Sequence, residues 1–268
     1  MLLAINFSTQ AAVLQRLGAL QIDRFKCPEW PALIAEAVQY CPVAIHFSLS
    51  AGRGRIFRKD LDEVEKIAQQ TGTPFINLHL ESKRQDFPEI SPDSVRPAHR
   101  ERIFRQMLEE VQLAIRRFGS ERVIVENVPY RLNGNVLKPS ADPEIIARIA
   151  HETNCGFLLD IPHARIAALS LGIDEREYMA ALPIQNLKEL HFTGVQNLDG
   201  WLQDHVPAQA ADWQALDWVL ARIQSQDWPK PWMLALEYSG VGEKFNWRSD
   251  AQMIAAQCAG LRKRIGQI

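Results

Sequence analysis

Eight short apolar runs, each followed by a longer segment with helical periodicity, most constrain how this chain can fold. The predicted strands are 3–6, 21–26, 43–47, 75–80, 122–127, 156–160, 187–192 and 233–238. The predicted helices are 10–20, 31–40, 61–70, 97–118, 143–153, 163–171, 213–226 and 250–265. This alternation is typical of βα units wound around a parallel sheet.

Eight such units in 268 residues indicate a (β/α)8 TIM barrel, with residues 1–268 forming one domain. An open doubly wound sheet usually has fewer strands and often a glycine-rich phosphate turn after the first one. No such turn follows 3–6, and the nearest glycine cluster, Gly52-Arg-Gly54, lacks the Lys-Ser/Thr pair of a P-loop. We interpret that cluster as a flexible loop.

The charge balance disfavours several classes of partner. The chain has 30 Lys+Arg against 32 Asp+Glu, so no basic field would attract nucleic acid, and a nucleic-acid partner is not expected. No apolar run approaches the roughly 18 residues of a membrane helix, and the apolar start lacks the basic region of a signal peptide. The four cysteines form no Cys-x-x-Cys pair. We therefore expect a cytoplasmic protein without a membrane partner.

Histidines gather where a barrel would place its active site. In TIM barrels the loops at the carboxyl ends of the strands converge on one face, and function collects there. Five of the seven histidines fall at a predicted strand end or in the loop after it: His46, His79, His163, His191 and His205. Chance placement would put roughly a quarter to a third of them in that zone.

Carboxylates share this position. Glu126, Asp160 and Glu237 each end an apolar strand, where a charge is costly unless it is paired or coordinates a cation. Asp204 adds a fourth. Taken singly, Glu126 could pair with an arginine, and Asp160 could cap the following helix. Asp160-Ile-Pro-His163 is the most specific motif, because it directs a carboxylate and an imidazole to one mouth.

Together these side chains form a mixed nitrogen and oxygen donor set. Such sets suit Fe, Zn or Mn rather than Ca or Mg, and the number of donors predicts two or three divalent metal ions. Asp204 and His205 are adjacent, and neighbours in an extended loop point to opposite sides, so we expect only one of them to reach a metal.

The order of these residues along the chain resembles that of the xylose isomerase-like TIM-barrel superfamily. Three motifs most resemble its multinuclear non-haem iron oxidases, formerly a domain of unknown function: Val-Glu126-Asn127-Val-Pro, Leu190-His191-Phe-Thr-Gly194 and Asp204-His205-Val-Pro. The resemblance implies iron as the metal and O2-dependent modification of a ribosomally made peptide. It also implies a partner protein that presents the peptide.

The resemblance also implies roles for individual residues. Glu126 resembles the carboxylate that bridges two metals. His46 and His79 would bind one ion, and Asp160, His191 and Glu237 would lie around its neighbours. His163, with Asp204 or His205, would complete a second or third ion. Glu126 and Glu237 are the candidate catalytic carboxylates.

Other functions on the same platform stay open. Asn6-Phe-Ser stands where the iron oxidases usually carry a basic segment, and Pro162-His163 is closer to the endonuclease and isomerase pattern. The main alternative is a sugar isomerase or epimerase acting on a small-molecule substrate, in which a carboxylate base moves a proton beside a metal-polarised carbonyl. A type IV-like apurinic endonuclease and a non-catalytic binding barrel are further alternatives.

Overall fold

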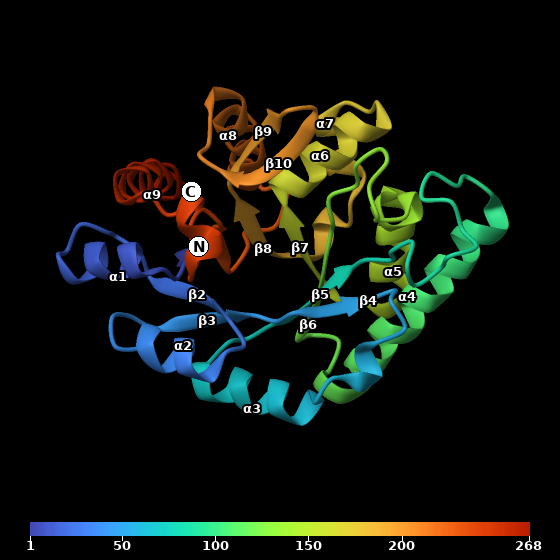
Figure 1. Cartoon of the computed structure of the whole chain (residues 1–268), viewed down its shortest axis with the longest axis horizontal. Helices are drawn as coiled ribbons and strands as arrows, with labels where there is room; N and C mark the ends of the chain where they lie inside the picture. The colour runs from blue at the N-terminus through green and yellow to red at the C-terminus, as the bar shows by residue number, and fades with distance from the viewer.

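The predicted apolar runs form one curled parallel sheet in the computed structural model, which describes residues 1–268 (Figure 1). Its strands are β1 (Leu2–Asn6), β2 (Arg24–Pro28), β3 (Val43–His46), β4 (Leu49–Ala51), β5 (Ile76–Leu80), β6 (Val123–Glu126), β7 (Gly156–Asp160), β8 (Leu187–Phe192) and β11 (Met233–Leu236). The order is β3-β2-β1-β11-β8-β7-β6-β5-β4. The fold is a single-domain TIM barrel, as the sequence predicts.

The barrel closes between two short consecutive strands. The third predicted strand, 43–47, forms β3, which pairs with β2, and after a break at Phe47 and Ser48 the chain forms β4, an unpredicted strand that pairs with β5. At the break, the amide of Asn77 replaces the backbone ladder: its Oδ1 accepts from Phe47 N at 2.8 Å and its Nδ2 donates to Phe47 O at 3.2 Å. β3 and β4, the first and last strands in the sheet order, are therefore connected directly by the chain at Phe47 and Ser48.

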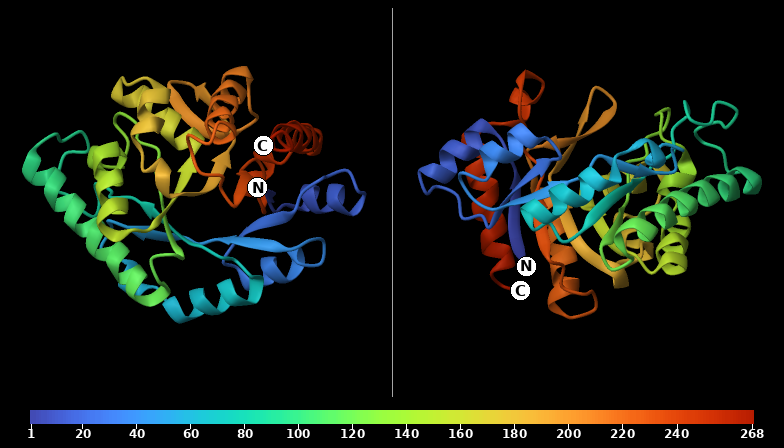
Figure 2. Two further views of the ribbon diagram at one scale, coloured as in Figure 1. Left: turned by 180° about the vertical axis from the view of Figure 1, so that it is seen from behind. Right: turned by 90° about the horizontal axis from the view of Figure 1, so that it is seen from below.

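Helices cover the outside of the sheet (Figures 1 and 2). They are α1 (Thr9–Arg16), α2 (Pro31–Ala37), α3 (Leu61–Thr71), α4 (Pro97–Phe118), α5 (Pro143–Thr153), α6 (Ile161–Leu171), α7 (Glu175–Ala181), α8 (Ala210–Gln224) and α9 (Ala251–Ile265), with short 3-10 helices η1 (Ile56–Arg58), η2 (Lys138–Ala141), η3 (Ile184–Asn186) and η4 (Glu243–Arg248). None has the length and apolar character needed to cross a bilayer. The termini lie close together in Figure 2, because β1 pairs with β11.

Besides β4 and the short 3-10 helices, two elements were not predicted from the sequence. One is α7, a short helix that Asp174 caps by accepting from the backbone of Arg176 and Glu177. The other is an antiparallel hairpin of β9 (Gly194–Leu198) and β10 (Trp201–Val206), which lies between the predicted strand 187–192 and the predicted helix 213–226. Asp199 and Gly200 at its tip both have positive φ, as a two-residue hairpin turn requires.

Alternation along the strands separates the core from the barrel interior. On β5, Ile76, Leu78 and Leu80 belong to the main apolar core between the sheet and its helices, whereas Asn77 and His79 point the other way. Near the amino ends of the strands the interior is filled by a small cluster of Ala4, Ala44, Met233 and Ala235. Small apolar residues thus fill one end of the barrel, and the polar residues occupy the other.

The Gly52-Arg-Gly54 loop is not free, contrary to our interpretation. The buried carboxylate of Glu110, on α4, accepts five backbone N–H groups from residues 52–56 at 2.6 to 3.0 Å. Gly52 has φ of +109°, and a Cβ there would lie 2.7 Å from Met107 Cγ. The glycines let the backbone wrap this carboxylate, so the loop is fixed.

We expect Glu110→Gln to lower the free energy of unfolding by about 3 kcal/mol, because an amide NH2 would face backbone donors that lose their charged acceptor. Denaturant unfolding measures this change. Glu109→Gln is the matched control, since Glu109 is the exposed neighbour on the same helix. A loss below about 1 kcal/mol would mean that water can replace the carboxylate.

Candidate metal centre

The predicted donors from the strands point to one place because they occupy inward positions at the carboxyl ends of neighbouring strands. His79 and Glu126 are register partners on β5 and β6, and Asp160 and His191 are register partners on β7 and β8. His46 ends β3, and Glu237 follows the last residue of β11. The structure therefore brings together the donors that the sequence singled out.

Glu126 stands at the middle of the group, and its two oxygens face different histidines. Its Oε2 lies 3.7 Å from His46 Nε2 and 3.5 Å from His79 Nε2, and these two nitrogens are 3.4 Å apart. Its Oε1 lies 3.6 Å from His191 Nδ1 and 3.9 Å from His163 Nδ1. An ion on each side would make Glu126 a bridging carboxylate, which is the role that the resemblance implies.

The second set of donors surrounds His191, which is fully buried. Its Nδ1 has no hydrogen-bond partner, although it lies 3.4 Å from Asp160 Oδ2 and 3.2 Å from Glu237 Oε1. A buried nitrogen left without a partner among three carboxylates is costly. A cation bound between them would remove that cost.

The third set comes from α6 and the unpredicted hairpin. Asp204 Oδ2 lies 3.3 Å from His163 Nε2, and His205 Nδ1 lies 3.9 Å from Glu237 Oε2. Both adjacent residues therefore contact a donor of the centre, and the expectation that only one of them reaches a metal stays a prediction. Both contacts form because the strand is irregular between Gln203 and Val206, where His205 adopts φ of 58° and the alternation of the strand is interrupted.

The pKa shifts show that negative charge dominates the centre. Burial opposes ionisation of Glu126, but His79 and His46 outweigh it and hold the pKa of Glu126 well below its usual range. Burial likewise opposes the charged form of His163, but Asp160 and Asp204 raise the pKa of His163 to about 10. The pKa of His191 is also raised, with burial opposed by Glu237. These histidines hold protons where metal ions would supply the positive charge.

Geometry and donor chemistry both fit metal ions. Two ligand atoms bound at about 2.1 Å to one ion lie about 3.0 to 3.4 Å apart for bond angles near 90 to 110°. The observed separations, 3.2 to 3.9 Å, are slightly wider. In three donor triads the ligand atoms all lie within 4.8 Å of one another: His46, Glu126 and His191; Glu126, Asp160 and His163; Asp160, His191 and Glu237. Imidazole and carboxylate together suit Fe, Zn or Mn.

Sequence reasoning missed a buried pair beside these donors. Lys26 Nζ contacts both Glu189 Oε1 and His191 Nε2, and Glu189 Oε1 lies 3.0 Å from His191 Nε2. Holding Nε2 in this way directs Nδ1 of His191 to the donors. Glu189 could have been predicted from the alternation of side chains along the strand, because Glu189 lies two residues before His191 and so faces the same side.

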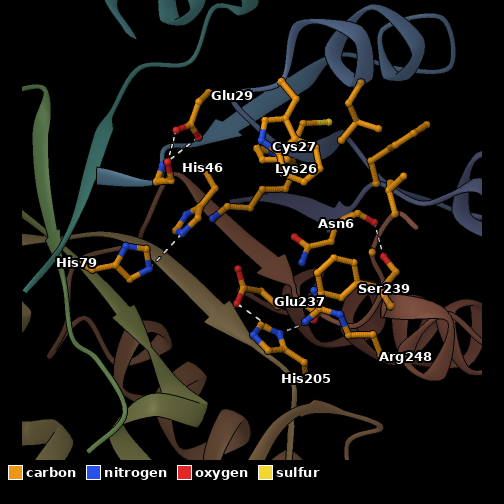
Figure 3. Close-up of a pocket in the computed structure, with 18 of the residues that line it drawn as sticks. Asn6, Lys26, Cys27, Glu29, His46, His79, His205, Glu237, Ser239 and Arg248 are labelled. Atoms are coloured by element: carbon orange, nitrogen blue, oxygen red, sulfur yellow. Dashed lines mark hydrogen bonds and ion pairs between the residues drawn. The ribbon is translucent and has the colours of Figure 1, made fainter. Parts of the chain in front are cut away.

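A cavity of about 400 Å³ opens onto the centre and contains the ligand candidates His46, His79, Glu126, His163, His205 and Glu237 in its wall (Figure 3). The rest of the wall comes from the end of β1, from β2 and the start of α2, from Ser48, and from the segment after β11. Apolar side chains such as Phe7, Leu33 and Phe245 lie beside polar ones such as Asn6 and Arg248. This combination suits a small polar group bound next to the metals.

We expect Glu189→Gln to weaken zinc binding about 10- to 100-fold, because the orienting partner of His191 loses its charge. Competition with a chelator measures the affinity without any assay of activity. Lys188→Gln, an exposed change on the same strand, is the control. Equal affinities in wild type and Glu189→Gln would show that the barrel alone orients His191.

Zinc affinity of the metal-free protein should rise with pH between 6 and 9. The pKa of His163 is raised to about 10 and that of His191 is raised as well, so both carry protons at pH 7 that a metal must expel. The affinity should rise about tenfold per pH unit for each proton released. His163→Gln should lower this slope by one proton, whereas a flat profile in wild type would contradict the assignment.

Comparison with solved structures agrees with the fold. Endonuclease IV from Thermus thermophilus superimposes with a TM-score of 0.56 at 18% identity, over 98% of this chain and 100% of that one. A D-tagatose 3-epimerase-like protein gives 0.58 at 11%, over 99% and 100%. AP endonuclease, family 2 from Brucella melitensis gives 0.58 at 15%, over 97% and 99%. At these identities the likeness establishes the fold alone.

Sequence comparison identifies the family. The chain is 25% identical over 191 residues to a UPF0276 protein of Acaryochloris marina, a match that covers 68% of this chain and 66% of that protein. It is 32% identical over 82 residues to a UPF0276 protein of Chromobacterium violaceum, which covers 30% of each. Residues 26–234 match the model of a family described as RiPP precursor modification enzyme MbnB/TglH/ChrH. The chain therefore belongs to the MbnB/TglH/ChrH family.

Proposed function

We propose that this protein is an iron-dependent oxidase that uses O2 to modify a residue of a ribosomally made peptide. Family membership and the enzymes among its structural neighbours support a metal-dependent TIM-barrel enzyme. The observation that carries the finer proposal is the family match, whose description concerns peptide precursors. The position of Glu126, whose two oxygens face separate pairs of histidines, fits a centre with more than one metal. A partner protein that presents the peptide is part of the proposal.

Bound iron would supply the redox chemistry toward O2, and the chain's own residues set the conditions for it. His46 and His79 would hold one ion with Glu126. His191, Asp160 and Glu237 would hold its neighbour, and His163 with Asp204 and His205 offers donors for a third. A cluster of apolar residues fills the other end of the barrel interior, and the cavity opens onto the centre at the carboxyl ends of the strands.

Neutral and charged donors are divided in a way that suits redox-active metals. Burial lowers the pKa of His46 to about 3, so this imidazole is neutral and ready to coordinate. Although burial opposes ionisation of Glu237, His191 and His205 lower its pKa to about 2, so it is ionised at neutral pH. Glu237 also faces the cavity, so its ionised carboxylate is placed to hold a cation beside the substrate.

The sugar isomerase or epimerase hypothesis uses the same donors but needs no redox metal. Its solved counterparts resemble this chain at 11% and 12% identity, which speaks to the fold only. The family match carries the choice, because its description concerns peptide precursors rather than sugars.

Protein purified without chelator should contain two or three equivalents of iron and consume O2 when given its peptide. The double variant Glu126→Ala, Asp160→Ala removes the bridging carboxylate and a donor of the second set, so it should lose most of the iron and the O2 uptake. Elemental analysis and an oxygen electrode measure both.

Glu109→Gln serves as the control, because it lies on the outer helix α4 and is exposed. Manganese or zinc in place of iron, with exchange of a carbon-bound proton in a sugar, would favour the isomerase. Absence of any metal above background after reconstitution would refute a metalloenzyme of either kind.

A further inference from the structure

Arg248 is the one cation of the cavity wall with no polar partner in the chain. Its Nε is buried without a hydrogen-bond partner, and none of the ion pairs of the chain includes its guanidinium. Lys26, on the same wall, contacts Glu189. Arg131, which lies near the centre, donates from Nε to Leu202 O at 2.6 Å and lies 3.6 Å from Asp204. A partly buried guanidinium without a partner is costly, so the protein keeps Arg248 unpaired at an energetic cost.

Packing, rather than polar contacts, holds Arg248 in place. Its Cζ lies 4.4 Å from the centre of the Phe245 ring. A Cβ on Gly240 would lie 3.2 Å from Arg248 Nη2 and 2.8 Å from Phe245 Cβ, so the glycine leaves room for both side chains. The buried hydroxyl of Ser249 closes the segment, since it donates to Phe245 O at 2.9 Å and accepts from Gly240 N at 3.2 Å.

This arrangement prepares a binding surface inside the cavity. Arg248 lines the same cavity as His205 and Glu237, and Figure 3 shows it beside them on one side of the pocket. A guanidinium stacked on an aromatic ring leaves its edge, with two parallel N–H donors, free for a planar pair of oxygens. Protein carboxylates supply no such pair here, so the matching group must come from the substrate.

We propose that Arg248 binds a carboxylate of the peptide substrate and thereby selects which peptide residue reaches the metal centre. The inference rests on the proposed function, because it takes the substrate to be a peptide. A peptide offers this group either at its carboxyl terminus or on an aspartate or glutamate side chain. Arg248 is thus a specificity-determining residue rather than a ligand of the metals.

Calorimetric titration of three short probes tests the proposal with protein as purified, its metals bound and O2 excluded. The probes are N-acetyl-triglycine, its carboxyl-terminal amide, and N-acetyl-Gly-Asp-Gly amide. At least one acid should bind wild type about tenfold or more tightly than the neutral amide, since hydrogen bonds to charged groups are the strong ones. The acid that binds more tightly than the amide shows whether Arg248 recognises a terminal or a side-chain carboxylate.

Arg248→Gln should abolish this advantage and leave the metal content unchanged, while thermal stability should not fall, because the unpaired charge is removed. Lys244→Met is the matched control, because Lys244 is exposed on the same 3-10 helix, and it should retain the advantage. An equal affinity for acids and amide in wild type, or no binding of either acid, would overturn the proposal. So would an advantage that persists in Arg248→Gln, which would mean that the metals hold the carboxylate.

Loss of metal in Arg248→Gln would also overturn the assignment, since it would make Arg248 a support of the centre. The titration involves no turnover, so its outcome is separate from that of the oxidase proposal. A carboxylate preference that depends on Arg248 in a protein without O2 uptake would refute the oxidase and keep the binding site. Iron and O2 uptake without that preference would refute the Arg248 site and keep the oxidase.

Discussion

The rest of the site depends on one buried carboxylate, that of Glu126 at the end of β6, with 1% of the residue exposed. It sits among three other carboxylates, Asp160, Asp204 and Glu237, that are also buried. Without a cation this concentration of negative charge is balanced mainly by protons on neighbouring histidines and by Lys26 and Arg131. The barrel therefore carries a centre that is unfavourable when empty, and metal binding and folding stability must be coupled.

The strand period makes such a centre possible without loss of the core. One side of every strand packs against helices, and the other side faces the barrel interior, which changes from alanines at one end to donors at the other. Polar groups in the interior therefore displace no side chain from the apolar core outside. The same rule explains why Asn77 and Glu189, which are not ligand candidates, contact the ligands: they share the inward side with His79 and His191.

Sequence reasoning predicted the barrel, all eight strand positions and the convergence of nine candidate donors. It succeeded because period-two and helical patterns are local, and because charges at the ends of apolar strands are rare. It missed the β9–β10 hairpin, although Asp199-Gly200 is a turn signal, because polar strands on the surface lack an apolar run. It missed Lys26 and the wrapped carboxylate of Glu110 because their partners lie 163 and 54 to 58 residues away along the chain.

Two parts of the cavity wall differ in how freely they can change. The donor side is built on strands whose register is shared, so moving one donor would shift its neighbours as well. Another part of the wall comes from a short 3-10 helix after β11, which is held by Gly240 and Ser249 and carries Arg248 at its end, beside His205 and Glu237 (Figure 3). A substitution there alters the surface that a substrate meets without touching the barrel. Within one family, a fixed metal platform and a replaceable wall would allow the same donors to serve different peptides.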